Sequence, residues 1–174
     1  MIYGFEFRLS GVEALSRSEV NAILKEAWYL TGRRWRQQFL PLKWARGAKQ
    51  RYNYTPRAGE RRGGYPAPKS YTGRKLAFLG HTRALEFSGE TRREALTREN
   101  ISATRDKVVV RLPRKFNLRR PGSPVRMNEE IRRVRPEELA SLRFFLTNHI
   151  RNRLRLSGEK KSRVIFGGQP AAAA

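Results

Sequence analysis

The sequence predicts an α+β fold, in which two long helices pack on a small, mostly antiparallel sheet and long basic loops connect the elements. Two amphipathic stretches place apolar side chains at the spacing of a helix, and shorter stretches alternate apolar and polar residues as strands do. The remaining segments are rich in Arg, Lys, Gly, Pro and Tyr and show no periodicity. A chain of 174 residues suffices for one domain, which we place at residues 1–166, followed by a flexible tail at 167–174.

The first predicted elements are a strand and a long helix. Residues 2–9 alternate apolar and polar side chains, which indicates a half-buried strand. Ser16 and Glu19 have the spacing of a capping box, and the helix that follows is expected to stop before Pro41. Its apolar face consists of Val20, Ile23, Leu24, Ala27, Leu30, Thr31 and Trp35. Its other face carries Arg33, Arg34 and Arg36, either as a solvated surface or as a binding surface.

A long basic loop, the first arm, is predicted at residues 43–83. It contains eleven cations and one anion, Glu60, and no run of apolar residues at helical or strand spacing. Its tyrosines alternate with Arg and Lys, a mixture that can stack on bases and pair with phosphates, but that protein interfaces also use. Both kinds of partner remain open. The candidate partner-binding residues of this arm are Lys49, Arg51, Tyr52, Tyr54, Arg57, Arg61, Arg62, Lys69, Tyr71, Arg74 and Lys75.

A turn, a short helix and a hairpin are expected after the first arm. Residues 84–89 form a short apolar segment and turn, and residues 91–96 have a helical pattern. Residues 100–103 and 107–112 predict the two strands of a hairpin, joined by a three-residue turn. The side chains of the second strand that we expect to face the core are Val108, Val110 and Leu112.

A second arm and a second long helix complete the predicted fold. Residues 113–135 are basic and irregular, which predicts another extended loop. A helix begins at Pro136, followed by two acids where the helix dipole favours negative charge, and it ends at residues 157–158. Residues 162–166 predict a last strand. The candidate partner-binding residues of the second arm are Arg119 and Arg120. The apolar face of the helix consists of Leu139, Leu142, Phe145, Leu146, Ile150 and Leu154.

The charge of the chain indicates a negatively charged partner. Lys and Arg total 38 against 15 acidic residues, a formal net charge of +23. Nucleic acid, acidic protein surfaces and anionic membranes would all attract such a chain. Membrane is the weakest of the three, because no apolar run approaches the roughly 20 residues that span a bilayer. The N-terminus also lacks a signal pattern, so we expect no membrane association and a cytoplasmic site of synthesis.

No catalytic residue, metal ligand or cofactor is predicted. The chain has no cysteine, and His81 and His149 are too far apart in the sequence to suggest a ligand pair. Ser88 does not lie in the G-x-S-x-G pattern of a nucleophile elbow, and the glutamates around it alternate with Arg as on a solvated helix. The glycines do not have the spacing of a phosphate-binding loop. We therefore expect no enzymatic activity.

The order of these parts resembles the virion morphogenesis proteins of tailed bacteriophages, which are neck or tail-completion components at the head–tail junction. The resemblance covers residues 1–112 and is carried by residues 51–57, 69–71 and above all 83–96, where an apolar-Ser-Gly-x-x-Arg motif follows the basic loop. Ala84 stands where Pro is common in that family, and the second arm is an insertion. Which layer of the neck or tail the protein would occupy therefore stays open. The structural residues of the motif are Phe87, Ser88, Gly89 and Arg92. Phe87 would anchor the turn, and Gly89 would supply a backbone conformation that a side chain hinders.

The resemblance implies a non-enzymatic structural protein that is assembled in the host cytoplasm and resides in the virion. Its implied partners are other virion proteins (portal or connector, tail terminator or tail tube) and copies of itself in a ring, while contact with genomic DNA stays open. The arms would contact these neighbours, because segments that order on binding can cover a large surface. The alternative is a basic nucleic-acid-binding structural protein of the ribosomal or nucleoid type.

Overall fold

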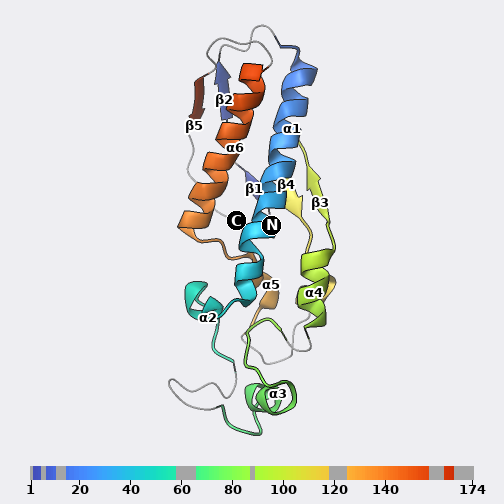
Figure 1. Cartoon of the computed structure of the whole chain (residues 1–174), viewed down its shortest axis with the longest axis vertical. Helices are drawn as coiled ribbons and strands as arrows, with labels where there is room; N and C mark the ends of the chain where they lie inside the picture. The colour runs from blue at the N-terminus through green and yellow to red at the C-terminus, as the bar shows by residue number, and fades with distance from the viewer. Residues whose placement is uncertain are drawn as a thin grey trace. The chain divides into compact units, whose positions relative to one another are not determined.

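The fold is α+β, as predicted, with helices and small antiparallel sheets (Figure 1). A computed structural model describes residues 2–4, 7–10, 15–57, 66–86, 89–117, 125–156 and 163–166. This described part contains six α-helices, two of them long, so the prediction of two long helices is incomplete. The predicted tail at residues 167–174 lies outside it.

The chain divides into two compact units. Unit 1 consists of Met1–Arg36, Asn100–Arg111 and Pro136–Ala174, and unit 2 consists of Gln37–Glu99 and Leu112–Arg135. The single domain expected over residues 1–166 stays a prediction.

Unit 1 contains an antiparallel sheet in which the described strands have the order β1, β4, β3 (Figure 1). The strands are β1 (Ile2–Gly4), β3 (Ile101–Ala103) and β4 (Lys107–Val110). The hairpin predicted from the sequence is confirmed, and the N–H of Thr104 donates to the carbonyl oxygen of Lys107 across its turn at 2.9 Å. Val108 is buried as predicted, whereas Leu112 lies beyond the end of β4.

A second pair of strands also lies in unit 1. β2 (Phe7–Ser10) pairs antiparallel with β5 (Arg163–Phe166), so the last predicted strand is confirmed. The prediction of one continuous strand at residues 2–9 is wrong, because its two halves pair with different strands. Alternation of apolar residues indicates a strand and its buried face, but it does not identify the strand's neighbour.

The long helix α1 (Arg17–Arg34) begins with the predicted capping box. The N–H of Glu19 donates to Ser16 Oγ at 3.3 Å, and the N–H of Ser16 donates to Glu19 Oε2 at 2.8 Å. The Ser16 hydroxyl also donates to Glu19 Oε2 at 2.6 Å, and this bond, together with the one from the N–H of Ser16, holds the pKa of the Glu19 carboxyl below its ordinary value. The helix continues directly into a π-helical turn, η1 (Trp35–Phe39), so the helix that begins with α1 ends before Pro41 as predicted.

The core of unit 1 lies between α1, β3, β4 and the second long helix, α6 (Pro136–Leu156). Its buried residues are Ile23, Ala27, Trp28, Val108, Leu146, Ile150 and Leu154. Both predicted apolar helix faces contribute to this core. Trp28, which the predicted face did not include, is fully buried, and its indole N–H donates to the carbonyl oxygen of Arg105 in the hairpin turn at 3.0 Å.

Unit 2 is helical in its described part, and the short helix predicted at residues 91–96 is confirmed as α4. Its elements are η2 (Pro41–Trp44), α2 (Ala48–Arg51), α3 (Tyr71–Leu79), α4 (Glu90–Thr97), η3 (Arg114–Asn117) and α5 (Met127–Arg132). The prediction that the arms at 43–83 and 113–135 are loops is therefore wrong for much of their described length.

Buried side chains explain why the arms are ordered. Trp44, Tyr52 and Tyr54 of the first arm are each 3% exposed, and Phe116 and Ile131 of the second arm are 2% and 0% exposed. The rings of Trp44 and Phe116, one from each arm, lie 6.2 Å apart. These apolar residues come from short helical turns and from segments between them, so their spacing has no period that the sequence could reveal.

Candidate functional site

The predicted site residues that the structure describes all lie in unit 2. Those outside the described residues are Arg61, Arg62, Phe87, Ser88, Arg119 and Arg120. The others are Lys49, Arg51, Tyr52, Tyr54, Arg57, Lys69, Tyr71, Arg74, Lys75, Gly89 and Arg92. They lie in a buried network, in α3, in the turn before α4, in a pocket lined by cations, and at the surface.

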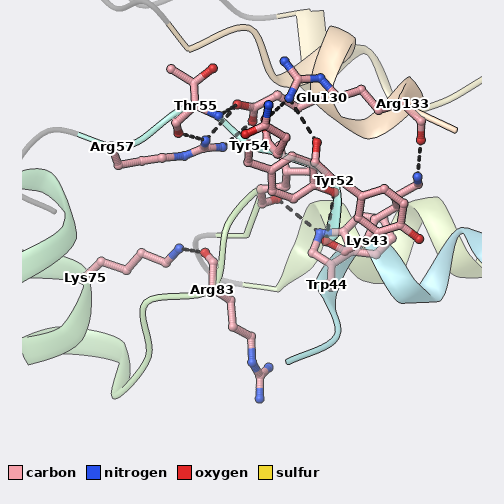
Figure 2. A network of polar contacts seen from close by, with 12 residues as sticks. Lys43, Trp44, Tyr52, Tyr54, Thr55, Arg57, Lys75, Arg83, Glu130 and Arg133 are labelled. Atoms are coloured by element: carbon pink, nitrogen blue, oxygen red, sulfur yellow. Dashed lines mark hydrogen bonds and ion pairs between the residues drawn. The ribbon is translucent and has the colours of Figure 1, made fainter. Parts of the chain in front are cut away.

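The buried network begins at Lys43, whose side chain has no exposed surface. Its ammonium group donates to the carbonyl oxygen of Arg133 and lies 3.4 Å from the centroid of the Tyr52 ring (Figure 2). A buried ammonium is costly unless polar groups replace its water, and an aromatic face is one such substitute. Lys43 thereby connects η2 to the segment that follows α5.

Tyr52 and Tyr54 stack on one another inside this network, with ring centroids 5.8 Å apart. The Tyr54 hydroxyl donates to the carbonyl oxygen of Lys43 at 3.2 Å. Burial raises the pKa of the Tyr54 phenol far above its ordinary value, and the neighbouring Tyr52 and Glu130 raise it further. The predicted role of both tyrosines in contacting a partner does not fit their burial, because neither ring offers an exposed face.

Arg57 and Glu130 form the ionic part of the network. Arg57 Nη1 lies 2.9 Å from Glu130 Oε1, and Arg57 Nη2 lies 2.5 Å from Glu130 Oε2 (Figure 2). Glu130 also accepts the backbone N–H of Thr55 at 2.8 Å. The Arg57 side chain is 10% exposed and the Glu130 side chain 1%. Arg57 was predicted to bind a partner, but its guanidinium is occupied inside the fold.

Arg133 completes the network from the end of α5. Its Nη1 donates to the carbonyl oxygen of Tyr52 at 3.0 Å and also to that of Asn53. Asn53 has a φ of +49°, in the left-handed region that Asn adopts more readily than most residues. The predicted site residues did not include Lys43, Glu130 and Arg133, because composition does not distinguish a buried charge from an exposed one.

Lys75, in α3, is a second buried lysine whose ammonium binds a backbone carbonyl oxygen within unit 2. It is 3% exposed, and its ammonium donates to the carbonyl oxygen of Arg83 (Figure 2). The helix itself is capped by Ser70, whose Oγ accepts the N–H of Gly73 at 3.0 Å. Surface residues among the predicted set are Arg51, Lys69 and Arg74, which are exposed, and Lys49 and Tyr71, which are partly buried.

The turn before α4 contains two residues with positive φ, Leu85 at +58° and Gly89 at +84°. Gly89 is the N-cap of α4, so the prediction that this glycine adopts a conformation unfavourable for other residues is confirmed. The carbonyl oxygen of Leu85 accepts the indole N–H of Trp44 at 3.4 Å. This turn positions Arg92, the last residue of the predicted motif, at the start of α4.

A pocket of about 700 Å³, the cationic pocket, lies beside this turn in unit 2. Its cationic lining residues are Lys43, Arg46, Lys49, Arg83 and Arg92. No acidic residue is among the described residues that line it. Arg46 and Arg83 belong to the first arm but were not selected as site residues, because only the fold brings them near Arg92.

The described residues contain no group of three or more His, Asp or Glu side chains that could hold a metal ion. None of the described helices has the length and apolar composition that a membrane crossing requires. Comparison with known proteins finds no family model, no curated protein and no solved structure that matches the chain.

Proposed function

We propose that the chain is a structural protein of a tailed-phage virion, located at the head–tail junction as a neck or tail-completion component. It assembles in the host cytoplasm through contacts with other virion proteins, such as the portal or connector, tail terminator or tail tube, and with copies of itself in a ring. The assignment to this class of protein rests on the sequence resemblance of residues 51–57, 69–71 and 83–96.

The observation that supports a structural role is the internal attachment of the two arms. Lys43, Arg57 and Arg133 are bound to carbonyl oxygens, an aromatic ring or a carboxylate within unit 2. A segment that binds nucleic acid keeps its cations available for phosphates and its aromatic faces available for bases. Arms that form a compact body instead suit a subunit with fixed interfaces.

The exposed cations of the arms are the candidate contacts with acidic faces of neighbouring proteins. Arg51, Lys69 and Arg74 belong to this group. The same positive charge would also attract nucleic acid, which is the alternative function. The two functions differ in their salt dependence, because the logarithm of nucleic-acid affinity falls by roughly 0.7 to 0.9 per neutralised phosphate for each tenfold rise in salt.

The mass of the purified protein at moderate salt, measured by light scattering with and without DNA, tests the proposal. We expect a defined oligomer whose mass DNA does not change. A monomer that coats DNA stoichiometrically would overturn the proposal in favour of the nucleic-acid-binding alternative.

Two matched triple variants sharpen this test. Arg51→Ala/Lys69→Ala/Arg74→Ala removes three exposed cations from the first arm and is expected to reduce assembly with little effect on DNA affinity. The control removes three exposed cations elsewhere, Arg98, Arg111 and Arg151, by substitution with Ala. Equal assembly of the two variants would contradict a role of the first arm in protein contacts.

A further inference from the structure

The cationic pocket of unit 2 carries positive charge that the described residues near it only partly compensate. The buried carboxylate of Glu86 lies 3.4 Å from Arg83 and 3.5 Å from Arg92, so one anion faces two guanidinium groups. Each guanidinium has five N–H donors, and these long contacts use few of them. Arg46, which also lines the pocket, is exposed. Three arginines can therefore present donors to a ligand in this pocket.

Side-chain hydrogen bonds from within unit 2 hold the backbone beside the pocket. Lys75 donates to the carbonyl oxygen of Arg83, and the Trp44 indole donates to that of Leu85. Figure 2 shows the guanidinium of Arg83 extending away from the Lys43 network, on a backbone that Lys75 holds. Donors on an ordered backbone lose less conformational entropy on binding, which favours affinity for a ligand of matching charge.

The lining favours carboxylates of a peptide over the phosphates and bases of a nucleic acid. Trp44 is the aromatic residue among the described lining residues, and it is 3% exposed, so no base can stack on it. A guanidinium pairs with a carboxylate or a phosphate through two parallel hydrogen bonds, so the arginines suit both, and the lack of an exposed aromatic face is what favours the peptide. The side chains of Gln50 and Thr82 also line the pocket and could hydrogen-bond a peptide backbone.

We infer that the cationic pocket binds the carboxylate side chains of an acidic segment of a partner protein, with Arg46, Arg83 and Arg92 as its principal donors. This inference rests on the proposed function, because it gives the chemistry of one contact between the protein and its neighbours. It adds a concave site for a peptide to the exposed cations of the arms.

Fluorescence polarisation with a labelled hexaglutamate peptide tests the inference. A thymidine oligonucleotide with six phosphates is the competing probe of equal charge. The double variant Arg46→Ala/Arg83→Ala leaves Arg92 to pair with Glu86, so the buried carboxylate keeps a partner. The control Arg98→Ala/Arg111→Ala removes the same charge from exposed positions that do not line the pocket.

We expect the wild type to bind the peptide more tightly than the oligonucleotide, and the pocket variant to bind the peptide about tenfold more weakly or worse, since it loses two charge-assisted contacts. The control is expected to stay within about twofold of the wild type. Tighter binding of the oligonucleotide, or equal losses in the two variants, would overturn the inference. A thermal melt of both variants shows whether a loss of binding reflects a loss of folding.

Light scattering on the same samples separates this inference from the proposed function. An oligomer that DNA leaves unchanged, together with a pocket that ignores the peptide, would refute the peptide site and leave the structural role standing. A monomer that coats DNA would refute the structural role itself, whatever the peptide measurement shows.

Discussion

The guanidinium of Arg57 and the carboxylate of Glu130 form a two-point ion pair between positions 73 residues apart in the sequence. The first residue follows the short helix α2 and the second lies in α5, so the pair connects the two arms of unit 2. Removing two charges from water is expensive, and the cost is offset here by good geometry and by the N–H of Thr55. The pair therefore fixes how the arms fold together.

Loss of Glu130 is expected to destabilise unit 2 strongly. Glu130→Ala leaves the guanidinium of Arg57 without its carboxylate, and breaking a buried pair in this way costs about 3–5 kcal/mol of unfolding free energy. Urea denaturation followed by tryptophan fluorescence measures the loss. Glu129→Ala is the control, because Glu129 pairs with Arg126 at the surface, where ion pairs contribute little. Similar losses in the two variants would contradict the structural role of the pair.

Replacing both members of this pair provides a second test. The double variant Arg57→Met/Glu130→Leu leaves neither charge unpaired, so it is expected to be more stable than Glu130→Ala. The same urea titration compares them. A double variant less stable than the single one would show that packing around these side chains, and not the unpaired charge, dominates the loss.

The sequence predicted the elements whose signals are local. Ser16 and Glu19 identify the start of α1 because a capping box needs only those two side chains, three residues apart. The unusual backbone conformation of Gly89, whose φ is +84°, was predictable because glycine lacks the Cβ that makes this region unfavourable for other residues. The hairpin likewise follows from two alternating segments and a short turn.

The buried network and the pocket could not be predicted in the same way. The buried ammonium of Lys43 binds the carbonyl oxygen of Arg133, 90 residues later, and sequence spacing does not reveal such a contact. The many cations and the lack of periodicity predicted extended loops for both arms, although Phe116 and Ile131 were present as isolated apolar residues. Tertiary burial, rather than helical periodicity, orders these segments.

Gly32 allows close approach of α1 to the sheet of unit 1, so Gly32→Ala is expected to destabilise the protein. Helix propensity alone favours Ala by about 1 kcal/mol. However, a Cβ at this position would lie 2.5 Å from Val108 Cγ2 and 3.2 Å from Ile101 Cγ2. Overpacking of this kind costs roughly 1–3 kcal/mol, so the clash should outweigh the gain. Thermal unfolding measures the net effect.

Shortening Val108 identifies the clash as the cause. In a Val108→Ala background the contact with Cγ2 is gone, so adding Gly32→Ala is expected to cost less than it does in the wild type. Equal costs in both backgrounds would assign the destabilisation to something other than Val108.

Burial of Tyr54 is expected to make the protein sensitive to alkaline pH. Its pKa is raised in the folded state from an ordinary value of 10.0, so the phenol ionises more readily in the unfolded chain. The contribution to stability is present below about pH 10 and is lost as the pH rises above it. Urea titrations between about pH 8 and about pH 11 measure this slope.

Tyr54→Phe separates the two contributions of the phenol. At neutral pH the variant loses the hydrogen bond to the carbonyl oxygen of Lys43, at a cost of about 1 kcal/mol. Above about pH 10 its unfolding free energy is expected to fall less steeply than that of the wild type, because one ionising group has been removed. Identical slopes for the two proteins would contradict the burial of this hydroxyl.

Gly89 offers a test of the turn that places Arg92 beside the cationic pocket. A Cβ at this position would meet Glu86 Oε1 at 3.6 Å, an ordinary contact, so the cost of Gly89→Ala comes from its positive φ and not from a clash. That cost is about 1–2 kcal/mol, and Gly89→Asn is expected to lose less because Asn adopts this conformation more readily. We expect the urea midpoint to fall in the order wild type, Gly89→Asn, Gly89→Ala. Equal midpoints for the two variants would show that the positive φ is not the cause.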